Sequence, residues 1–240
     1  MTTAARHIGI VGCSAAGAAL CYRTICIEGT AYLGAPYAHP EVSMHTQPFS
    51  AYAAPLDARD WDGVADLMLD SAAKLARAGA DFLICPDNTI HGAMSLVEPA
   101  SPLPWLNMVS IVAAEAATRQ YRRVGLLGTR WLIDSETYPE ALRSRGVDFM
   151  RPSDEEREEG HRIIMQELVF ENFNPQGITY HQSVIERMKD NGCDAVVLGC
   201  TELPLILNDS NSPLPTLDST RLLAREALRA AVASKTLERA

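Results

Sequence analysis

The sequence predicts an α/β protein made of two pseudosymmetric halves, each built on a parallel β-sheet. Short apolar runs alternate along the chain with segments of helical periodicity, which is typical of parallel strands covered by helices on both faces. Three stretches of the first half also recur, in the same order, in the second half. With 240 residues, the chain is long enough for each half to bury its own core.

Four buried strands are expected from runs of apolar, often β-branched residues. The runs cover residues 8–11, 82–85, 124–127 and 195–198. A loop of small residues, 12–17, follows the first run and precedes a helix that is expected to reach about Glu28. The first run is too short for the apolar region of a signal peptide, so we interpret it as a strand.

Two helices have recognisable ends. The first is indicated by apolar residues at helical spacing, and Gly79 follows it as the expected C-terminal cap. Its apolar positions are Trp61, Val64, Met68, Ala72 and Leu75. The second is a long helix expected to reach about Phe170, and the capping-box pair Ser153 and Glu156 marks its start.

The internal repeat divides the chain into two copies of one plan. The matched stretches are 6–12 with 122–128, 79–81 with 192–194, and 101–107 with 212–218. Their offsets of 116, 113 and 111 are collinear, and this period is too long for a solenoid. We therefore expect a first domain formed by residues 1–112 and 217–240 and bearing Asp87. The second domain is expected to be formed by residues 113–216 and to bear Cys200.

The composition argues against several classes of protein. The 21 basic and 30 acidic residues give a net charge of −9, so we expect no nucleic-acid partner. No apolar run approaches the roughly 18 residues of a membrane span, so we expect no membrane partner. The lysines are Lys74, Lys189 and Lys235, which leaves few positions for the Schiff base of pyridoxal phosphate.

The six cysteines are expected to be free thiols. They form no CxxC pair and no Cys/His spacing typical of zinc, so no metal site is expected. The chain is not a small secreted scaffold of the kind that disulfides stabilise. A reducing compartment, the cytoplasm, is therefore the expected location.

Ionisable residues follow equivalent strands of the two halves. The offset of 113 makes Asp87 the partner of Cys200, and Asn88 the partner of Thr201. Ligands of open α/β sheets bind beyond the carboxyl ends of the strands. Two such groups would approach one ligand in the cleft between the halves from opposite sides, which is the geometry needed to move a proton between the faces of a carbon atom.

The surroundings of these residues suggest how they would act. A thiol at a strand-to-helix turn lies near amide N–H groups, so the pKa of Cys200 is expected to be lowered and the thiol to serve as a base. The same amides, with Asn88 and Thr201, would hold a carboxylate and stabilise its growing charge. Ser14, in the loop after the first strand, is a further candidate for ligand contact. Cys85 remains an alternative to Asp87, although the repeat places it in the strand.

Two motifs carry a resemblance to a known family. The sequences Asn88-Thr89-x-His91 and Gly199-Cys200-Thr201-Glu202 resemble the paired signatures of the aspartate/glutamate racemase superfamily, and residues 125–129 and 163–168 also fit. The resemblance covers essentially the whole chain. It implies a homodimeric amino-acid racemase that needs no cofactor, with Thr89, Thr129 and Glu202 among the residues that line the substrate site.

Two departures from the family pattern bear on the reaction and the substrate. Racemases of this type usually carry cysteine where this chain has Asp87, which would make the two acid/base groups unequal. They commonly carry a lysine for the distal carboxylate where this chain has Glu159, and the segment containing His45 has no arginine. We therefore expect His45 and Glu159 to contact a substrate other than aspartate or glutamate, with a neutral or cationic side chain.

Three functional hypotheses follow. The leading one is a cofactor-independent racemase or epimerase in which Cys200 and Asp87 exchange the α-proton of an amino acid. The first alternative is another reaction of the superfamily, such as decarboxylation with protonation by one thiol; carbon dioxide release from substituted malonates would reveal it. The second is a non-catalytic protein that binds an amino acid or related carboxylate, revealed by thermal stabilisation without exchange.

Overall fold

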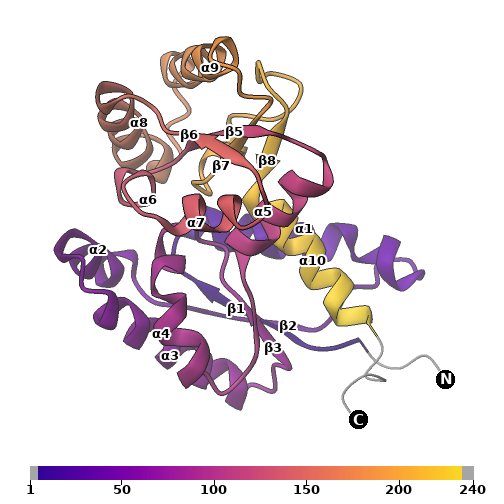
Figure 1. The fold of residues 1–240 in the computed structure, drawn as a ribbon. Coiled ribbons are helices and arrows are strands. Elements are labelled where there is room, and N and C mark those ends of the chain that lie inside the picture. Colours follow the sequence, from indigo (N-terminus) through magenta and orange to yellow (C-terminus); the bar gives the residue numbers. More distant parts are fainter. Residues whose placement is uncertain (1–4, 234–240) are drawn as a thin grey trace. The chain divides into compact units, whose positions relative to one another are not determined.

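Two four-stranded sheets form the framework of the protein in a computed structural model that describes residues 5–233 (Figure 1). Every strand pair is parallel, and the strand orders, β2-β1-β3-β4 and β6-β5-β7-β8, are the same plan used twice. The predicted α/β class with two similar parallel-sheet halves is therefore confirmed. The strands are β1 (Ile8–Gly12), β2 (Val42–Thr46), β3 (Phe82–Ile84), β4 (Trp105–Leu106), β5 (Arg123–Leu127), β6 (Asp148–Met150), β7 (Ala195–Leu198) and β8 (Thr216–Asp218).

Helices connect the strands. The α-helices are α1 (Ala15–Leu33), α2 (Phe49–Ala58), α3 (Trp61–Arg77), α4 (Met94–Ala100), α5 (Met108–Thr118), α6 (Arg130–Ile133), α7 (Thr137–Arg143), α8 (Asp154–Gln166), α9 (Pro175–Asp190) and α10 (Ser219–Val232). Short 3₁₀ turns are η1 (Thr89–Ala93), η2 (Leu168–Phe170) and η3 (Leu203–Leu205). No helix within residues 5–233 combines the length and the apolar character that crossing a membrane requires.

The four predicted strands match β1, β3, β5 and β7, each to within one residue at either end. The capping box at Ser153 is also present: its hydroxyl accepts from the Glu156 N–H at 3.3 Å, while the Glu156 carboxylate accepts from the Ser153 N–H at 2.8 Å. Helix α8 ends at Gln166, four residues before the predicted end, and η2 continues the chain to Phe170. Helix α1 runs to Leu33, beyond the predicted Glu28.

The chain divides into two compact units, each with one sheet. Unit 1 contains the described residues of Met1–Pro86, Ala93–Asn107 and Leu223–Ala240, and unit 2 contains Asp87–Gly92 and Met108–Leu222. Asp87, expected on the first half, is thus in unit 2 together with Cys200.

The repeat is visible in the turns that precede β3 and β7. Gly79 and Gly192 both have positive φ angles, 90° and 86°, at the ends of α3 and α9. The next residues close equivalent turns, with Ala80 N–H bonded to the Leu75 carbonyl at 3.1 Å and Cys193 N–H bonded to the Met188 carbonyl at 3.0 Å. Equivalent residues therefore form equivalent hydrogen bonds in both halves.

The turns that lead into β4 and β8 repeat in the same way. The Ser101 hydroxyl donates to the Leu103 carbonyl at 2.8 Å, and the Ser212 hydroxyl donates to the Leu214 carbonyl at 2.7 Å. Each serine oxygen also accepts from the N–H of the same leucine. A serine two residues before the acceptor is a local turn motif, and here the turn precedes the edge strand of each sheet.

The sheet of unit 2 is buried on both faces. Alternate residues of β7 point to different cores, because Val196 and Leu198 pack with residues of α8 and α9 while Ala195 and Val197 pack with residues of α5 and α7. This is the arrangement expected of a parallel sheet covered by helices. The carboxyl end of β7, which precedes Cys200, is therefore packed between two hydrophobic cores.

Glycine at position 192 is required by its backbone conformation alone. A Cβ atom there would meet nothing within 4 Å, but φ is +86°. We expect Gly192→Ala to lower the free energy of unfolding by about 1 kcal/mol. Gly160, inside α8, is the matched control, because an added Cβ would meet only the His181 Nε2 at an unstrained 3.9 Å. Gly160→Ala should raise the stability by about 0.5–1 kcal/mol. Urea denaturation of both variants measures the change in the free energy of unfolding. A change in the same direction in both variants would contradict the role assigned to the positive φ of Gly192.

Candidate active site

The loop after β3 begins with a buried carboxylate. One oxygen of Asp87 accepts hydrogen bonds from the N–H groups of Thr89 at 2.9 Å and Ile90 at 3.2 Å. The side chain therefore caps the 3₁₀ turn η1, a common local role for aspartate. The cap fixes the position of the carboxylate, and it is compatible with chemistry at the same group.

His91 holds the same loop from within. Its Nε2 accepts from the Met108 N–H at 3.1 Å, so its Nδ1 carries the proton and donates to the Asp87 carbonyl at 2.6 Å. Burial lowers the pKa of His91 to about 4, although the bond to Asp87 opposes this shift. The ring is therefore a neutral support of the loop.

Asn88 is bound to the protein through both ends of its amide. Its oxygen accepts from the Tyr138 hydroxyl at 2.6 Å, and its nitrogen donates to the Ser219 hydroxyl at 3.0 Å. The residue is only 2% exposed. Its predicted contact with a ligand carboxylate would therefore be made by an amide whose orientation is already set.

Two of the predicted ligand hydroxyls lie together. The Oγ1 atoms of Thr89 and Thr129 are 3.2 Å apart. Thr129 follows β5 and caps α6, where its hydroxyl accepts from the Leu132 N–H at 3.4 Å. The structure thus joins residues that lie 40 positions apart in the sequence.

Glycine is needed where the loop that carries Cys200 begins. The Gly199 N–H donates to the Leu127 carbonyl at 2.8 Å, and a Cβ at position 199 would lie 2.7 Å from that carbonyl oxygen. A larger residue would push the loop away from β5. Gly199 thereby keeps the start of the loop that carries Cys200 against the end of β5.

Cys200, Thr201 and Glu202 form a buried polar cluster. The Cys200 thiol and the Thr201 hydroxyl donate to the same Glu202 oxygen, at 2.8 Å and 3.2 Å. The exposed fractions of the three residues are 8%, 2% and 3%. The structure therefore places the predicted residue Glu202 against the thiol.

Burial raises the pKa of the Cys200 thiol well above its usual range, and the charge and hydrogen bond of Glu202 add to this effect. The Asp87 carboxylate raises the pKa further, while the Glu202 N–H opposes the shift. The expected lowering of this pKa was wrong. The turn after the cysteine is only the three-residue η3, so there is no long helix dipole to offset a buried carboxylate.

Glu159 lies on α8 and is paired with a cation of its own helix. Arg162 binds both oxygens of its carboxylate, at 2.8 Å and 2.7 Å, and this lowers the pKa of Glu159. The side chain is 41% exposed. Contact of Glu159 with a substrate stays a prediction. The expected preference for a cationic substrate depends on the negative charge of Glu159, and Arg162 already balances that charge.

Ser14, His45 and Cys85 belong to unit 1. Ser14 caps α1 by accepting from the Gly17 N–H at 3.1 Å, and Cys85 is fully buried after β3. The Ser71 hydroxyl donates to a backbone carbonyl and so accepts from His45 Nδ1, at 3.0 Å. Burial lowers the pKa of His45, and the charge of Lys74 adds to this shift.

Tyr138 and Ser219 were not predicted. Both are buried, and both bond to Asn88. One signal for Ser219 was present in the sequence, because the repeat aligns this serine with the apolar Met108. A polar residue at a core position requires a hydrogen-bond partner.

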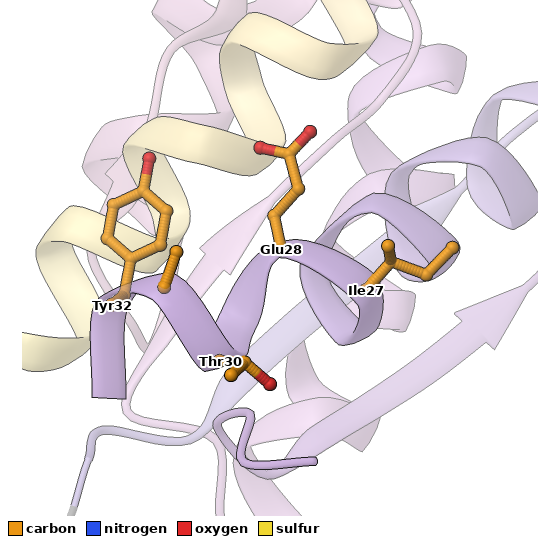
Figure 2. Close-up of a pocket in the computed structure, with 5 residues that line it drawn as sticks. Ile27, Glu28, Thr30 and Tyr32 are labelled. Carbon is orange, nitrogen blue, oxygen red and sulfur yellow. The ribbon is translucent and has the colours of Figure 1, made fainter. Parts of the chain in front are cut away.

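A surface pocket lies on helix α1 of unit 1 (Figure 2). It is lined by Ile27, Glu28, Thr30, Ala31 and Tyr32. The Glu28 carboxylate is bound on both oxygens by Arg225, at 2.8 Å and 2.9 Å. None of the predicted site residues lines this pocket.

Comparison with known proteins gives a consistent result. A model of the Asp/Glu/hydantoin racemase family matches residues 8–227. The chain is 24% identical over 191 residues to the broad specificity amino-acid racemase RacX of Bacillus subtilis, which covers 78% of this chain and 80% of the relative.

Solved structures are similar over nearly the whole chain. A Yersinia pestis protein provisionally described as an Asp/Glu racemase superposes with a TM-score of 0.84 at 27% identity, covering 95% of this chain and 99% of the other. An aspartate racemase homologue from Pyrococcus horikoshii OT3 gives 0.79 at 28% identity, covering 94% and 99%.

The buried His91 makes stability depend on pH. We expect its ring to stay neutral in the folded protein down to about pH 4, whereas the unfolded chain takes up this proton near pH 6.5. The free energy of unfolding should thus be unaffected by His91 above pH 6.5 and fall by about 3 kcal/mol between pH 6.5 and 4. Urea denaturation of wild type and His91→Gln over this range measures the difference. Equal pH dependence, or an NMR titration midpoint of the His91 ring near 6.5, would contradict it.

Proposed function

The chain belongs to the Asp/Glu/hydantoin racemase family, whose model matches residues 8–227, and from this premise we propose that it is an amino-acid racemase or epimerase that needs no cofactor. The observation that carries the proposal is the buried cluster at the end of β7, in which Glu202 holds the thiol of Cys200 and the charge of Asp87 acts on the same thiol. A thiol and a carboxylate within electrostatic reach are a suitable pair for moving a proton.

In the proposed reaction the two groups have different resting states. Cys200 is protonated, because burial and the charges of Glu202 and Asp87 raise its pKa, and Asp87 is assigned the role of the charged base. Asp87 therefore removes the α-proton on one face of the substrate, and Cys200 delivers its proton to the other face. The reverse direction starts from the opposite protonation states, so the two directions begin from unequal groups.

The charge that develops on the substrate carboxylate needs donors close by. Thr89 and Thr129 present two hydroxyls 3.2 Å apart, of which one proton joins the pair and the other can be donated to a ligand. The Thr201 hydroxyl, which donates to Glu202, becomes a third donor when it turns from that carboxylate to the substrate. With Asn88 they form the proposed carboxylate site, in which fixed donors stabilise the carbanion as its charge spreads onto oxygen.

The substrate is proposed to be an amino acid outside the aspartate and glutamate pair. Arg162 already balances Glu159, so a neutral side chain fits this position better than a charged one. The relative RacX is described as a broad specificity amino-acid racemase, which supports testing a wide panel.

A decarboxylase is the second candidate, and the protonated thiol favours it as well. Loss of carbon dioxide would form the carbanion without a base, and Cys200 would then supply the single proton. Release of carbon dioxide from substituted malonates, without exchange of any amino acid, would identify this reaction.

Exchange of the α-proton in heavy water tests the racemase directly. We expect wild type to incorporate deuterium into at least one amino acid of a panel of common L- and D-isomers, and Cys200→Ala to lose at least 100-fold in rate, as expected when a general acid is removed. Cys193→Ala is the matched control, because Cys193 is a buried free cysteine of unit 2 outside the cluster. Mass spectrometry and chiral chromatography provide the measurement.

Two results would overturn the proposal. One is full exchange by Cys200→Ala. The other is thermal stabilisation of wild type by amino acids with no exchange at all, which would indicate a binding protein.

The link between Cys200 and Glu202 can be tested without a substrate. Glu202→Gln removes the charge that raises the pKa of the thiol, so the thiolate fraction at pH 8 should increase. We expect iodoacetamide to modify Cys200 several times faster in this variant, as measured by peptide mass spectrometry. Cys26, which is partly exposed on α1, serves as the internal control for reagent activity. Slower or unchanged modification of Cys200 would refute the proposed role of Glu202.

A further inference from the structure

Three hydrogen bonds form a chain that starts on helix α7 and ends at the last residue of β7. The Tyr138 hydroxyl lies 2.6 Å from Asn88 Oδ1, and Asn88 Nδ2 lies 3.0 Å from the Ser219 hydroxyl. The Ser219 hydroxyl lies 2.9 Å from the Leu198 carbonyl oxygen. All four residues are at most 2% exposed.

The bond to Leu198 fixes which group donates and which accepts in all three hydrogen bonds. A carbonyl oxygen only accepts, so the Ser219 hydroxyl must donate its one proton to Leu198. The Ser219 oxygen can then only accept, which requires the nitrogen end of the Asn88 amide to face it. The oxygen end of the amide therefore faces Tyr138, whose phenol must be the donor.

The orientation of this amide matters for the proposed function. An asparagine side chain turned by 180° exchanges its donor and acceptor while keeping its shape. In the orientation set by these three hydrogen bonds, one N–H of the Asn88 amide donates to Ser219, and the second N–H takes no part in the three bonds. An N–H attracts a carboxylate, whereas an amide oxygen in its place would repel it.

We propose that Tyr138 and Ser219 are positioning residues that hold the Asn88 amide with its nitrogen directed to the substrate carboxylate. This rests on the proposed function, because it assigns Asn88 to that carboxylate. Tyr138 and Ser219 act through Asn88, and their hydroxyl groups also lie within hydrogen-bond reach of each other. The bond to Leu198 also ties the orientation of the amide to the strand that precedes Cys200.

The first test replaces the tyrosine without changing the ring. In Tyr138→Phe the amide loses its donor, and we expect kcat/KM for α-proton exchange to fall about tenfold, with the larger part of the loss in KM. Tyr180→Phe is the matched control: Tyr180 is in the same unit, and its hydroxyl is bonded to the Glu156 carbonyl, at 3.5 Å, rather than to Asn88. A fall in thermal stability alone, with unchanged KM, would show that Tyr138 only stabilises the fold.

The second test asks whether the two residues act through one group. Ser219→Ala should raise KM in the same way, and the double variant Tyr138→Phe with Ser219→Ala should lose little more than either single variant. Independent losses that multiply in the double variant would overturn the proposal.

The third test does not depend on activity. In ¹⁵N-labelled protein, the side-chain amide signals of Asn88 are identified by their absence from Asn88→Asp. We expect one pair of shifted, slowly exchanging signals in wild type and a changed pair in Tyr138→Phe, but not in Tyr180→Phe. An unchanged pair in Tyr138→Phe would refute the positioning role, whereas lack of exchange by wild type refutes the proposed function alone.

Discussion

Each buried polar group in the loop from Asp87 to His91 must have a hydrogen-bond partner, and unit 2 provides these partners. His91 accepts from the backbone of Met108, Thr89 meets Thr129, and Asn88 is held by Tyr138 and Ser219. An unpaired buried group costs roughly 1–3 kcal/mol, so the loop has one favourable arrangement. The same bonds bring the Asp87 carboxylate to where its charge acts on the Cys200 thiol. The arrangement of the candidate site therefore follows from the hydrogen bonds that the buried polar groups of this loop require.

The sequence predicts the centre of each sheet better than its edges. Strands β1, β3, β5 and β7 are continuous apolar runs because helices cover both of their faces. The edge strands β2, β4, β6 and β8 are short or partly exposed and have no such pattern. The repeat nevertheless marked the turns before β4 and β8, because the serine in each makes the same two bonds.

For the site, the sequence indicates which residues follow the strand ends better than it indicates their burial, hydrogen-bond partners and pKa values. The repeat and the family motifs identified Cys200, Asp87 and Glu202 as neighbours of strand ends, but they assigned Asp87 to the first half, whereas it lies in unit 2 with the other two. The sign of the pKa shift at Cys200 was missed, because it depends on burial and on the direction in which Glu202 points. Tyr138 was missed because its partner Asn88 is 50 residues away, and no local pattern records such a contact.

The hydrogen bond from Asn88 to Ser219 joins residues 131 positions apart. Closing a loop of that length costs chain entropy before any contact is gained, and such contacts form slowly compared with local ones. During synthesis the N-terminal residues leave the ribosome first, so Asn88 emerges 131 residues before the serine that accepts its N–H. A prematurely terminated product lacking residue 219 would leave the Asn88 amide without its acceptor.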